Sequence, residues 1–203
     1  MIELGILADD LTGGMMVASL LEREGVQCPL VSSVEGLPYV AGSTADAVVV
    51  ARKIRLIDPV EAQREARKAV KALQSIGCKR FFYKYCATFD STGKGNIGPI
   101  ADAMLEALGC DYTLFCPAFP EYTVTIFQGR MFLGSTPLGE SFKRVDPVTP
   151  MTNSNLVEVL QSQSRHSVGL LSHATLIRGK AATEEHILQN NSQRFFVADA
   201  ADD

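Results

Sequence analysis

Short apolar runs that alternate with amphipathic stretches are the feature that most limits how this chain can fold. Residues 2–7 and 47–51 are apolar runs of strand length, whereas residues 60–75 carry apolar side chains at helical spacing, with Arg and Lys on the other side. This alternation is typical of β-α-β units, in which helices cover a sheet of parallel strands. We therefore predict an α/β fold with a mainly parallel, Rossmann-like sheet flanked by helices.

The same patterns predict the elements along the rest of the chain. Residues 117–152 are rich in Pro, Gly and Thr, which predicts an insertion with a β-hairpin around residues 125–133 and little helix. At 203 residues, 46% of them hydrophobic, the chain fits one large domain covering residues 1–203. We expect further strands at 27–32, 81–85, 112–116, 168–171 and 194–197, and further helices at 15–24, 97–108, from 153 or 154 to 161, and 183–189.

The charge balance favours a small-molecule ligand. The chain has 19 basic and 23 acidic residues and a net charge of −4, so it lacks the basic excess that nucleic acids or anionic membranes attract. No apolar stretch reaches the roughly 18 residues that span a bilayer, and no signal-peptide pattern follows Met1. We expect a cytoplasmic protein with neither a nucleic acid nor a membrane as its partner.

The cysteine and histidine spacings do not indicate a metal site. The five cysteines show no CxxC spacing and the three histidines no HExxH spacing. We therefore expect reduced, mostly buried thiols and no structural metal.

In an open α/β sheet the ligand lies beyond the carboxyl ends of the strands, so the loops that follow the strands are where functional side chains are expected. The loop after the first strand offers Asp9, Asp10 and Thr12, although Asp10 or Thr12 as a plain helix cap is the better explanation of this loop taken alone. The loop after residues 47–51 offers Lys53 and Arg55 beside Arg52. These cations suit a carboxylate, and a solvated face is the alternative reading.

The loop between residues 84 and 96 is the densest in polar groups. It offers ammonium groups, hydroxyls, a carboxylate and an amide, which together suit a polyhydroxylated anion: Lys84, Thr88, Asp90, Ser91, Thr92, Lys94 and Asn96. A fourth polar patch, residues 149–155, is either a helix cap or a ligand contact.

Gly93, Gly95 and Gly98 in this loop match GxGxxG only formally. A long loop separates them from the preceding strand, and the acidic residue that a dinucleotide site requires is absent. A P-loop would need a glycine where Phe89 stands. The sequence therefore predicts no cofactor-binding residues in this chain.

Five segments, in this order, carry a family resemblance over almost the whole chain. They read ADDLTGG at 8–14, YKYCATFDSTGKGNIGP at 83–99, CPAFP at 116–120, QGRMFLG at 128–134 and PMTNSNL at 150–156. The chain resembles the four-carbon acid sugar kinases, long known as a domain of unknown function. It departs from their pattern in the first loop, where Gly14 stands for an alanine and Met16 for an aspartate, and at Ala87, Gly93, residues 122–124 and Arg130.

The resemblance implies the sugar-acid-binding N-terminal domain of a kinase that phosphorylates the terminal hydroxyl of a four-carbon sugar acid, such as a 3-oxo-tetronate or a threonate-like compound. In that family a C-terminal domain binds ATP with Mg²⁺. That nucleotide-binding domain would be this chain's partner, and the chain alone should be inactive. The same reading allows a homo-oligomer.

Under this hypothesis the substrate carboxylate is held by Lys53, Arg55 and Lys94. Ser91 and Asn96 would bind the substrate hydroxyls, and Asp10 or Asp90 would be the catalytic group at the acceptor hydroxyl. The remaining candidates for substrate binding are Asp9, Thr12 and Lys84.

Two other function classes remain open at this stage. One is a stand-alone sugar-acid-binding or regulatory module without catalysis. The other is a nicotinamide-dependent oxidoreductase, which rests on the formal GxGxxG alone.

Overall fold

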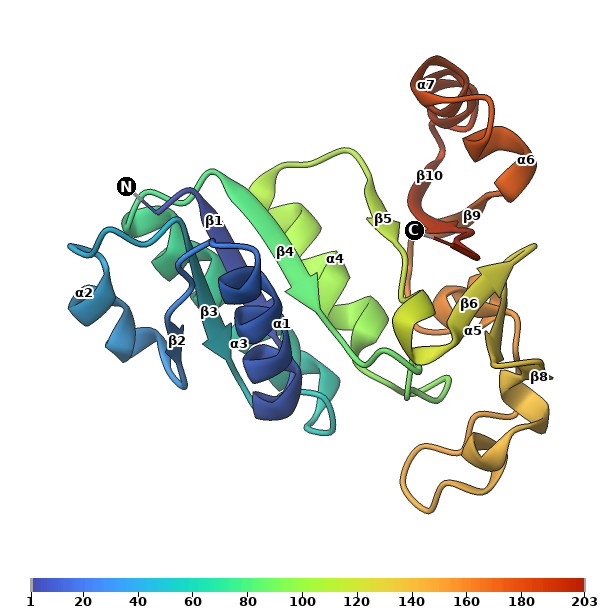
Figure 1. Cartoon of the computed structure of the whole chain (residues 1–203), viewed down its shortest axis with the longest axis horizontal. Helices are drawn as coiled ribbons and strands as arrows, with labels where there is room; N and C mark the ends of the chain where they lie inside the picture. The colour runs from blue at the N-terminus through green and yellow to red at the C-terminus, as the bar shows by residue number, and fades with distance from the viewer. Residues whose placement is uncertain (1, 203) are drawn as a thin grey trace. The chain divides into compact units, whose positions relative to one another are not determined.

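The computed structural model describes residues 2–202, and the chain divides into two compact units (Figure 1). The first unit comprises Met1–Cys86 and Pro99–Gly109, and the second comprises Ala87–Gly98 and Cys110–Asp203.

A parallel four-stranded sheet forms the centre of the first unit. Its strand order is β2 (Leu30–Val31), β3 (Ala47–Ala51), β1 (Leu4–Ala8) and β4 (Arg80–Lys84). Every pairing in it is parallel, with Leu4 opposite Ala47 on one side and opposite Arg80 on the other. Parallel strands require crossover connections, and the amphipathic segments supply them. The helical elements are α1 (Leu11–Arg23), η1 (Val34–Gly36), α2 (Leu37–Val40), α3 (Pro59–Ser75) and α4 (Ile97–Leu108), whose first two residues, Ile97 and Gly98, belong to the second unit.

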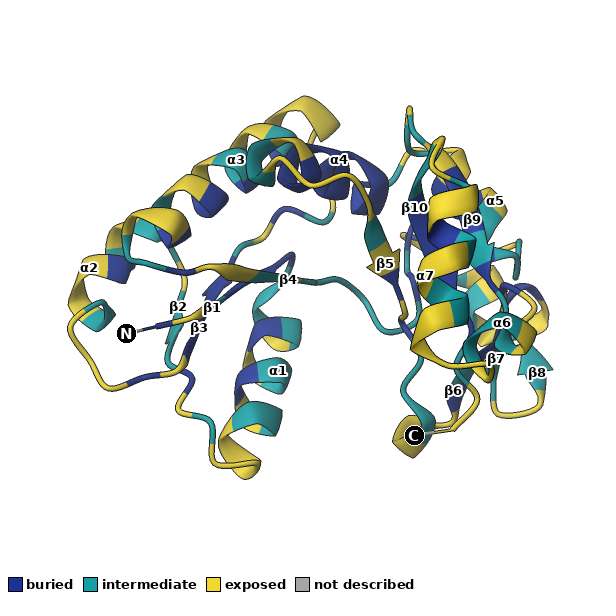
Figure 2. Ribbon diagram, turned by 90° about the horizontal axis from the view of Figure 1, so that it is seen from above, coloured by how far each residue is buried: buried dark blue, intermediate teal, exposed yellow. Residues whose placement is uncertain are grey.

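The helices of the first unit cover both faces of this sheet. Ile6 and Val49 pack in a cluster with Ala18 of α1, whereas Leu7 packs in a cluster with residues of α3 and α4. Figure 2 shows α1 on one face of the sheet and α3 with α4 on the other. A strand buried on both faces is apolar throughout, which explains the unbroken run AVVVA of β3.

Helix α3 follows the amphipathic pattern closely. Its N-terminus is capped by Asp58, whose carboxylate accepts the N–H groups of Val60 and Glu61, and Pro59 occupies the first turn. Its buried stripe consists of Ala62, Ala66, Ala69, Val70 and Leu73. Leu73 lies directly on Gly5 of β1, where an added Cβ would come within 3.1 Å of it.

The second unit contains a parallel three-stranded sheet and an antiparallel one. The parallel order is β5 (Thr113–Phe115), β10 (Gln193–Ala198) and β9 (Ser167–Leu171). The antiparallel sheet contains β6 (Val124–Phe127), β7 (Arg130–Leu133) and β8 (Thr136–Pro137). The helical elements are η2 (Pro120–Tyr122), η3 (Leu138–Glu140), η4 (Phe142–Val145), α5 (Leu156–Gln161), α6 (His173–Leu176) and α7 (Lys180–Gln189).

The predicted fold class is confirmed: parallel strands are flanked by helices, and a hairpin lies within the insertion. The parallel strands, however, form two sheets. Helix α1 begins at Leu11 and not at residue 15, because the Asp10 carboxylate caps it through the N–H of Gly13. Helix α5 begins at Leu156, because Asn155 is its cap. The short elements η1, α2 and α6 were not predicted.

Within residues 2–202, no helix is both long enough and apolar enough to cross a membrane.

Replacing Leu73 by Ala should lower the free energy of unfolding by about 2–5 kcal/mol, because it opens a cavity between α3 and β1. Lys71 is exposed on the same helix, so Lys71→Ala should change stability by less than about 0.5 kcal/mol. Urea titration of the two variants measures both values, and similar losses would contradict the packing of α3 described above.

Candidate functional site

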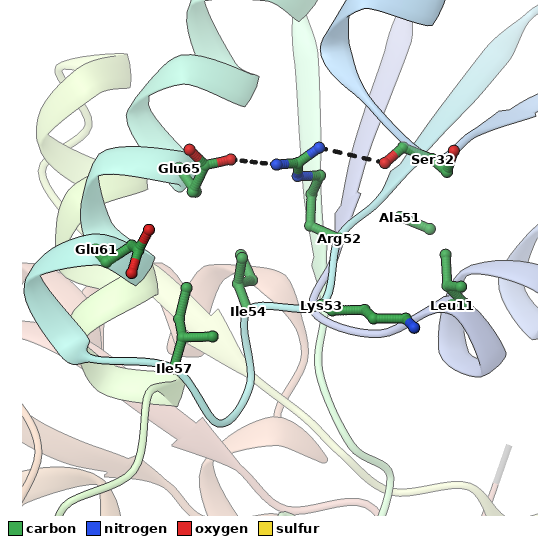
Figure 3. A pocket seen from close by; sticks show the side chains of 9 residues that line it. All are labelled: Leu11, Ser32, Ala51, Arg52, Lys53, Ile54, Ile57, Glu61 and Glu65. Carbon is green, nitrogen blue, oxygen red and sulfur yellow. Dashed lines mark hydrogen bonds and ion pairs between the residues drawn. The ribbon is translucent and has the colours of Figure 1, made fainter.

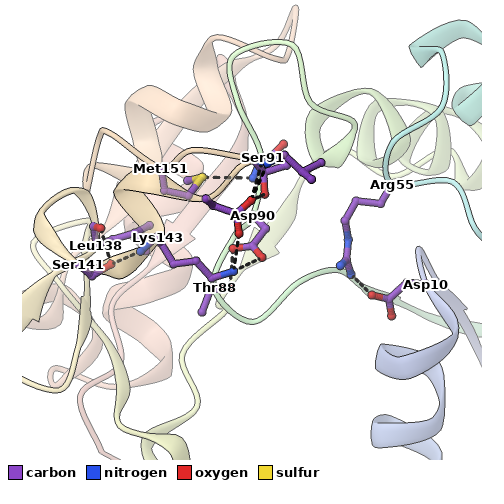
Figure 4. A network of polar contacts seen from close by, with 12 residues as sticks. Asp10, Arg55, Thr88, Asp90, Ser91, Leu138, Ser141, Lys143 and Met151 are labelled. Carbon is purple, nitrogen blue, oxygen red and sulfur yellow. Dashed lines mark hydrogen bonds and ion pairs between the residues drawn. The ribbon is translucent and has the colours of Figure 1, made fainter.

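Arg55 joins two aspartates at the carboxyl ends of β1 and β3. Its Nε donates to Asp9 Oδ2 at 3.1 Å and its Nη2 donates to Asp9 Oδ1 at 2.6 Å. The same Nη2 lies 2.7 Å from Asp10 Oδ2, an ion pair that Figure 4 shows. We call Asp9, Asp10 and Arg55 the ion cluster.

The backbone positions this cluster by extending the strand pairing beyond the end of β1. The N–H of Asp9 donates to the carbonyl of Lys84 at 3.1 Å, and the N–H of Ile54 donates to the carbonyl of Asp9 at 3.1 Å. After β1 the chain enters α1 on one face of the sheet, and after β3 it enters α3 on the other face. The cluster therefore lies where neighbouring loops diverge, which is where open α/β sheets bind their ligands.

Burial dominates the electrostatics of the cluster. Burial raises the pKa of Asp9, which is 1% exposed, while the hydrogen bond and charge of Arg55 oppose this rise. Burial acts to lower the pKa of Arg55, but the bond and charge of Asp9 outweigh it and raise the pKa. Arg55 is therefore charged at every relevant pH, and that charge is already shared between two carboxylates.

Two further polar side chains lie on β4 beside the cluster. Burial lowers the pKa of Lys84, with the charge of Asp9 opposing it, and the Lys84 ammonium donates to the carbonyl of Tyr85. Burial also raises the pKa of Tyr83, and its buried hydroxyl has no hydrogen-bond partner among residues 2–202. The charge of Asp9 affects the pKa of both side chains, so the titrations of Lys84, Tyr83 and the ion cluster are linked.

A pocket of about 430 Å³ lies at the ends of β2 and β3, also within the first unit. Figure 3 shows apolar side chains, Leu11, Ile54 and Ile57 among them, together with two cations. Arg52 is paired with Glu65 and donates to the carbonyl of Ser32. Lys53 is exposed, and its ammonium has no ion-pair partner in the described part of the chain. The structure thus places Lys53 in a pocket that Arg55 does not line.

In the second unit, Asp90 is held from two sides. Thr88 Oγ1 donates to Asp90 Oδ1 at 2.6 Å, and Lys143 Nζ donates to Asp90 Oδ2 at 2.6 Å (Figure 4). Lys143 also lies 3.5 Å from Asp146 Oδ2. The Asp90 and Lys143 side chains are each 15% exposed. Each carboxylate oxygen can accept more than one hydrogen bond, so Asp90 retains acceptor capacity.

Ser91 and Asn96 are buried, at 3% and 2% exposure. Ser91 Oγ accepts a hydrogen bond of 2.8 Å from Gln163 Nε2, and the N–H of Ser91 donates to Met151 Sδ at 3.2 Å. By contrast, Lys94 is exposed, and its ammonium has no ion-pair partner within residues 2–202. Lys94 is therefore the cation of this loop that an anion can reach.

The predicted site residues divide between the two units. The first unit holds Asp9, Asp10, Thr12, Lys53, Arg55 and Lys84, and the second holds Asp90, Ser91, Lys94 and Asn96. The structure brings Asp9, Asp10 and Arg55 together, while Thr12 is exposed in the first turn of α1. Sequence reasoning missed Lys143 and Gln163, which no motif connects with their partners. Met151 lies in the polar patch 149–155, but its contact with Ser91 was not predicted. Among the described residues, no group of three or more His, Cys, Asp or Glu side chains is arranged to hold a metal ion.

Replacing Arg55 by Met should destabilise the protein by about 3–5 kcal/mol at pH 8, because it leaves Asp9 buried without its cation. Without Arg55, the pKa of Asp9 rises further above its usual 3.8. A raised carboxyl pKa favours the folded state below the pKa of the unfolded chain, and this stabilisation is lost as the pH rises through the folded pKa.

The loss of unfolding free energy of Arg55→Met relative to wild type should therefore be smaller at pH 5 than at pH 8. Urea titrations at the two pH values measure this loss. Lys53→Met removes a lysine without an ion pair and serves as the control. It should lose little unfolding free energy at either pH value. A deficit of Arg55→Met that does not depend on pH would show that Asp9 is not buried as described.

Comparison with known proteins gives one consistent family. Over 206 residues the chain is 47% identical to the 3-oxo-tetronate kinase of Cupriavidus necator, covering 98% of this chain and 47% of that protein. It is 45% identical to the 3-oxo-tetronate kinase of Pseudomonas fluorescens, again covering 98% of this chain and 47% of that protein. The chain thus spans about half the length of the relatives it matches.

Solved structures show the same fold. A Salmonella typhimurium LT2 protein described as a tRNA synthase superposes with a TM-score of 0.93 at 36% identity, covering 100% of this chain and 48% of that one. A second match is a domain of unknown function from Bordetella bronchiseptica, solved as a domain-swapped dimer with bound citrate. It superposes with a TM-score of 0.80 at 26% identity, covering 99% of this chain and 49% of that one. The family model described as "sugar-binding N-terminal domain" matches residues 4–203, and the chain belongs to this family.

Proposed function

We propose that this chain is the sugar-acid-binding part of an ATP-dependent kinase that phosphorylates the terminal hydroxyl of a four-carbon sugar acid, 3-oxo-tetronate or a threonate-like compound. The observation that carries the proposal is the 47% identity to a 3-oxo-tetronate kinase over 98% of this chain. The citrate bound to the Bordetella bronchiseptica protein supports a carboxylate ligand.

The cations best suited to the substrate carboxylate are Lys53 and Lys94. Both are exposed lysines whose ammonium groups have no ion-pair partner within residues 2–202, so neither has to give up a protein carboxylate to bind the substrate. Arg55 already donates to Asp9 and Asp10, and moving it would leave Asp9 buried without its cation. For Arg55 we therefore propose a supporting role, in which it fixes the two aspartates.

For the acceptor hydroxyl of the substrate, we propose that Asp10 or Asp90 contacts and orients it. Both are ordered by neighbouring donors: Asp10 by Arg55 and the N–H of Gly13, and Asp90 by Thr88 and Lys143. Phosphoryl transfer depends mainly on holding the acceptor oxygen in line with the phosphate, so an oriented carboxylate is what the reaction requires. For Ser91 and Asn96 we propose that they shape the loop, because both are buried.

The glycine-rich loop of this chain is poorly suited to bind the phosphates of ATP with Mg²⁺. The glycines that formally match GxGxxG pack against other side chains: an added Cβ would lie 3.2 Å from Ser162 Oγ at Gly93 and 2.7 Å from Gln163 Cβ at Gly98. They do not form a loop of open N–H groups after a strand, as phosphate cradles do. We propose that the nucleotide is bound by a further part of a longer protein, in keeping with the greater length of the relatives.

A tRNA-directed function, as the description of the Salmonella protein would suggest, has no support in the charge of this chain. Binding to nucleic acids relies on Lys and Arg that neutralise phosphates, and the net charge here is −4.

Calorimetry with threonate and erythronate should show saturable binding to the chain, and threitol, which lacks the carboxylate, should bind much more weakly. Lys53→Met and Lys94→Met, tested separately, show which unit holds the carboxylate. Losing the cation that contacts it should weaken binding by about 10- to 100-fold.

Lys71→Met, an exposed lysine on α3, is the matched control. Equal affinity for threonate and threitol, or no binding of any four-carbon acid, would overturn the proposal. Turnover of ATP by the chain alone would overturn the assignment of the nucleotide to a further part of the protein.

A further inference from the structure

Gln163 bridges both ends of the loop that carries Lys94. Its Nε2 donates to Ser91 Oγ and to the carbonyl of Thr92, each at 2.8 Å. Its Oε1 accepts from the N–H of Gly98 at 2.9 Å. One side chain therefore engages both ends of the segment 91–98, and every contact lies within the second unit.

The hydrogen bond to Gly98 satisfies a backbone N–H at the start of a helix. Gly98 lies in the first turn of α4, where backbone N–H groups have no partner within the helix. Pro99, which follows it, has no N–H. Gln163 therefore caps α4 from a distant part of the sequence while its amide group fixes the start of the loop.

The glycines of the loop make this close approach possible. An added Cβ at Gly98 would lie 2.7 Å from Gln163 Cβ, and one at Gly95 would lie 1.7 Å from Ser91 Oγ. Gly93 faces Ser162, the residue before Gln163, at 3.2 Å. The spacing that resembles a dinucleotide motif thus reflects the packing of this loop on residues 162–163 and on Ser91.

We propose that Gln163 is a positioning residue, which holds segment 91–98 in the shape that presents Lys94 and the neighbouring Asp90 to a sugar acid. This inference rests on the proposed function. Within the segment, the N–H of Gly95 donates to the carbonyl of Thr92 at 2.8 Å and the N–H of Lys94 donates to Thr92 Oγ1 at 3.3 Å, contacts that shape its middle. Gln163 adds hydrogen bonds from outside the segment at both of its ends. Without Gln163 the ligand would have to order the loop on binding, and affinity would fall accordingly.

Two substitutions of nearly equal volume separate the contributions of Gln163. Gln163→Met removes all three hydrogen bonds, whereas Gln163→Glu keeps an acceptor for Gly98 and removes both donors. Gln189→Met is the matched control, because Gln189 is exposed on α7 and its amide donates to Glu185. Two measurements are made on each variant: calorimetry with threonate, and hydrogen exchange of the backbone amides.

We expect both Gln163 variants to bind threonate about 10-fold more weakly or worse. Exchange should become faster at residues 91–98 and stay unchanged in the sheets, so that lost affinity is not a sign of unfolding. Gln189→Met should match wild type in both measurements.

Wild-type affinity in either Gln163 variant would overturn the positioning role, even if exchange in the loop became faster. Should the wild-type chain bind no four-carbon acid, the proposed function fails, and hydrogen exchange still tests Gln163 separately. Unchanged exchange at residues 91–98 in Gln163→Met would show that Gln163 does not order the loop.

Discussion

The ion cluster of Arg55 with Asp9 and Asp10 is the interaction on which the first unit's binding edge depends. It connects the end of β1, the loop after β3 and the start of α1. A carboxylate as buried as Asp9 is tolerated only with a well-placed cation, so Arg55 cannot leave without a large loss of stability. The cluster adds little net stability, but it fixes the geometry of the edge.

In the second unit, too, largely buried polar groups are held by partners within the protein. Asp90 is engaged by Thr88 and Lys143, and Ser91 by Gln163 and Met151, so these polar groups form hydrogen bonds within the protein. Among the predicted site residues, the exposed cations are Lys94 and, in the first unit, Lys53. A polar loop that looks like a set of ligand contacts thus consists mainly of groups that order the loop, with single lysines left available for an anion.

Local sequence pattern predicted the elements whose burial is regular. Residues 47–51 and 97–108 match β3 and α4, because one is apolar on both faces and the other has a clear apolar stripe. The predicted start of α1 was wrong, because residues 8–14, which include Gly13 and Gly14, read as a loop. Gly14 instead lies in the helix and packs so closely on β3 that an added Cβ would lie 2.7 Å from Ala51 Cβ. The division of the strands into two sheets was not foreseen, since pairing of β5 with β10 joins distant segments. Lys143 and Gln163 lie 53 and 72 positions from their partners Asp90 and Ser91, a separation that no motif encodes.

Nitrogen-15 NMR of the arginine side chains tests most directly the central claim that Arg55 serves the fold and not the ligand. The Nε–H resonance of Arg55 reports its bond to Asp9 and can be followed while threonate is added. We predict that it stays unchanged up to saturation, while the amide resonances beside Lys53 or Lys94 shift. A shift of the Arg55 Nε–H resonance that follows the binding curve would show that Arg55 exchanges Asp9 for the ligand, which would contradict this account.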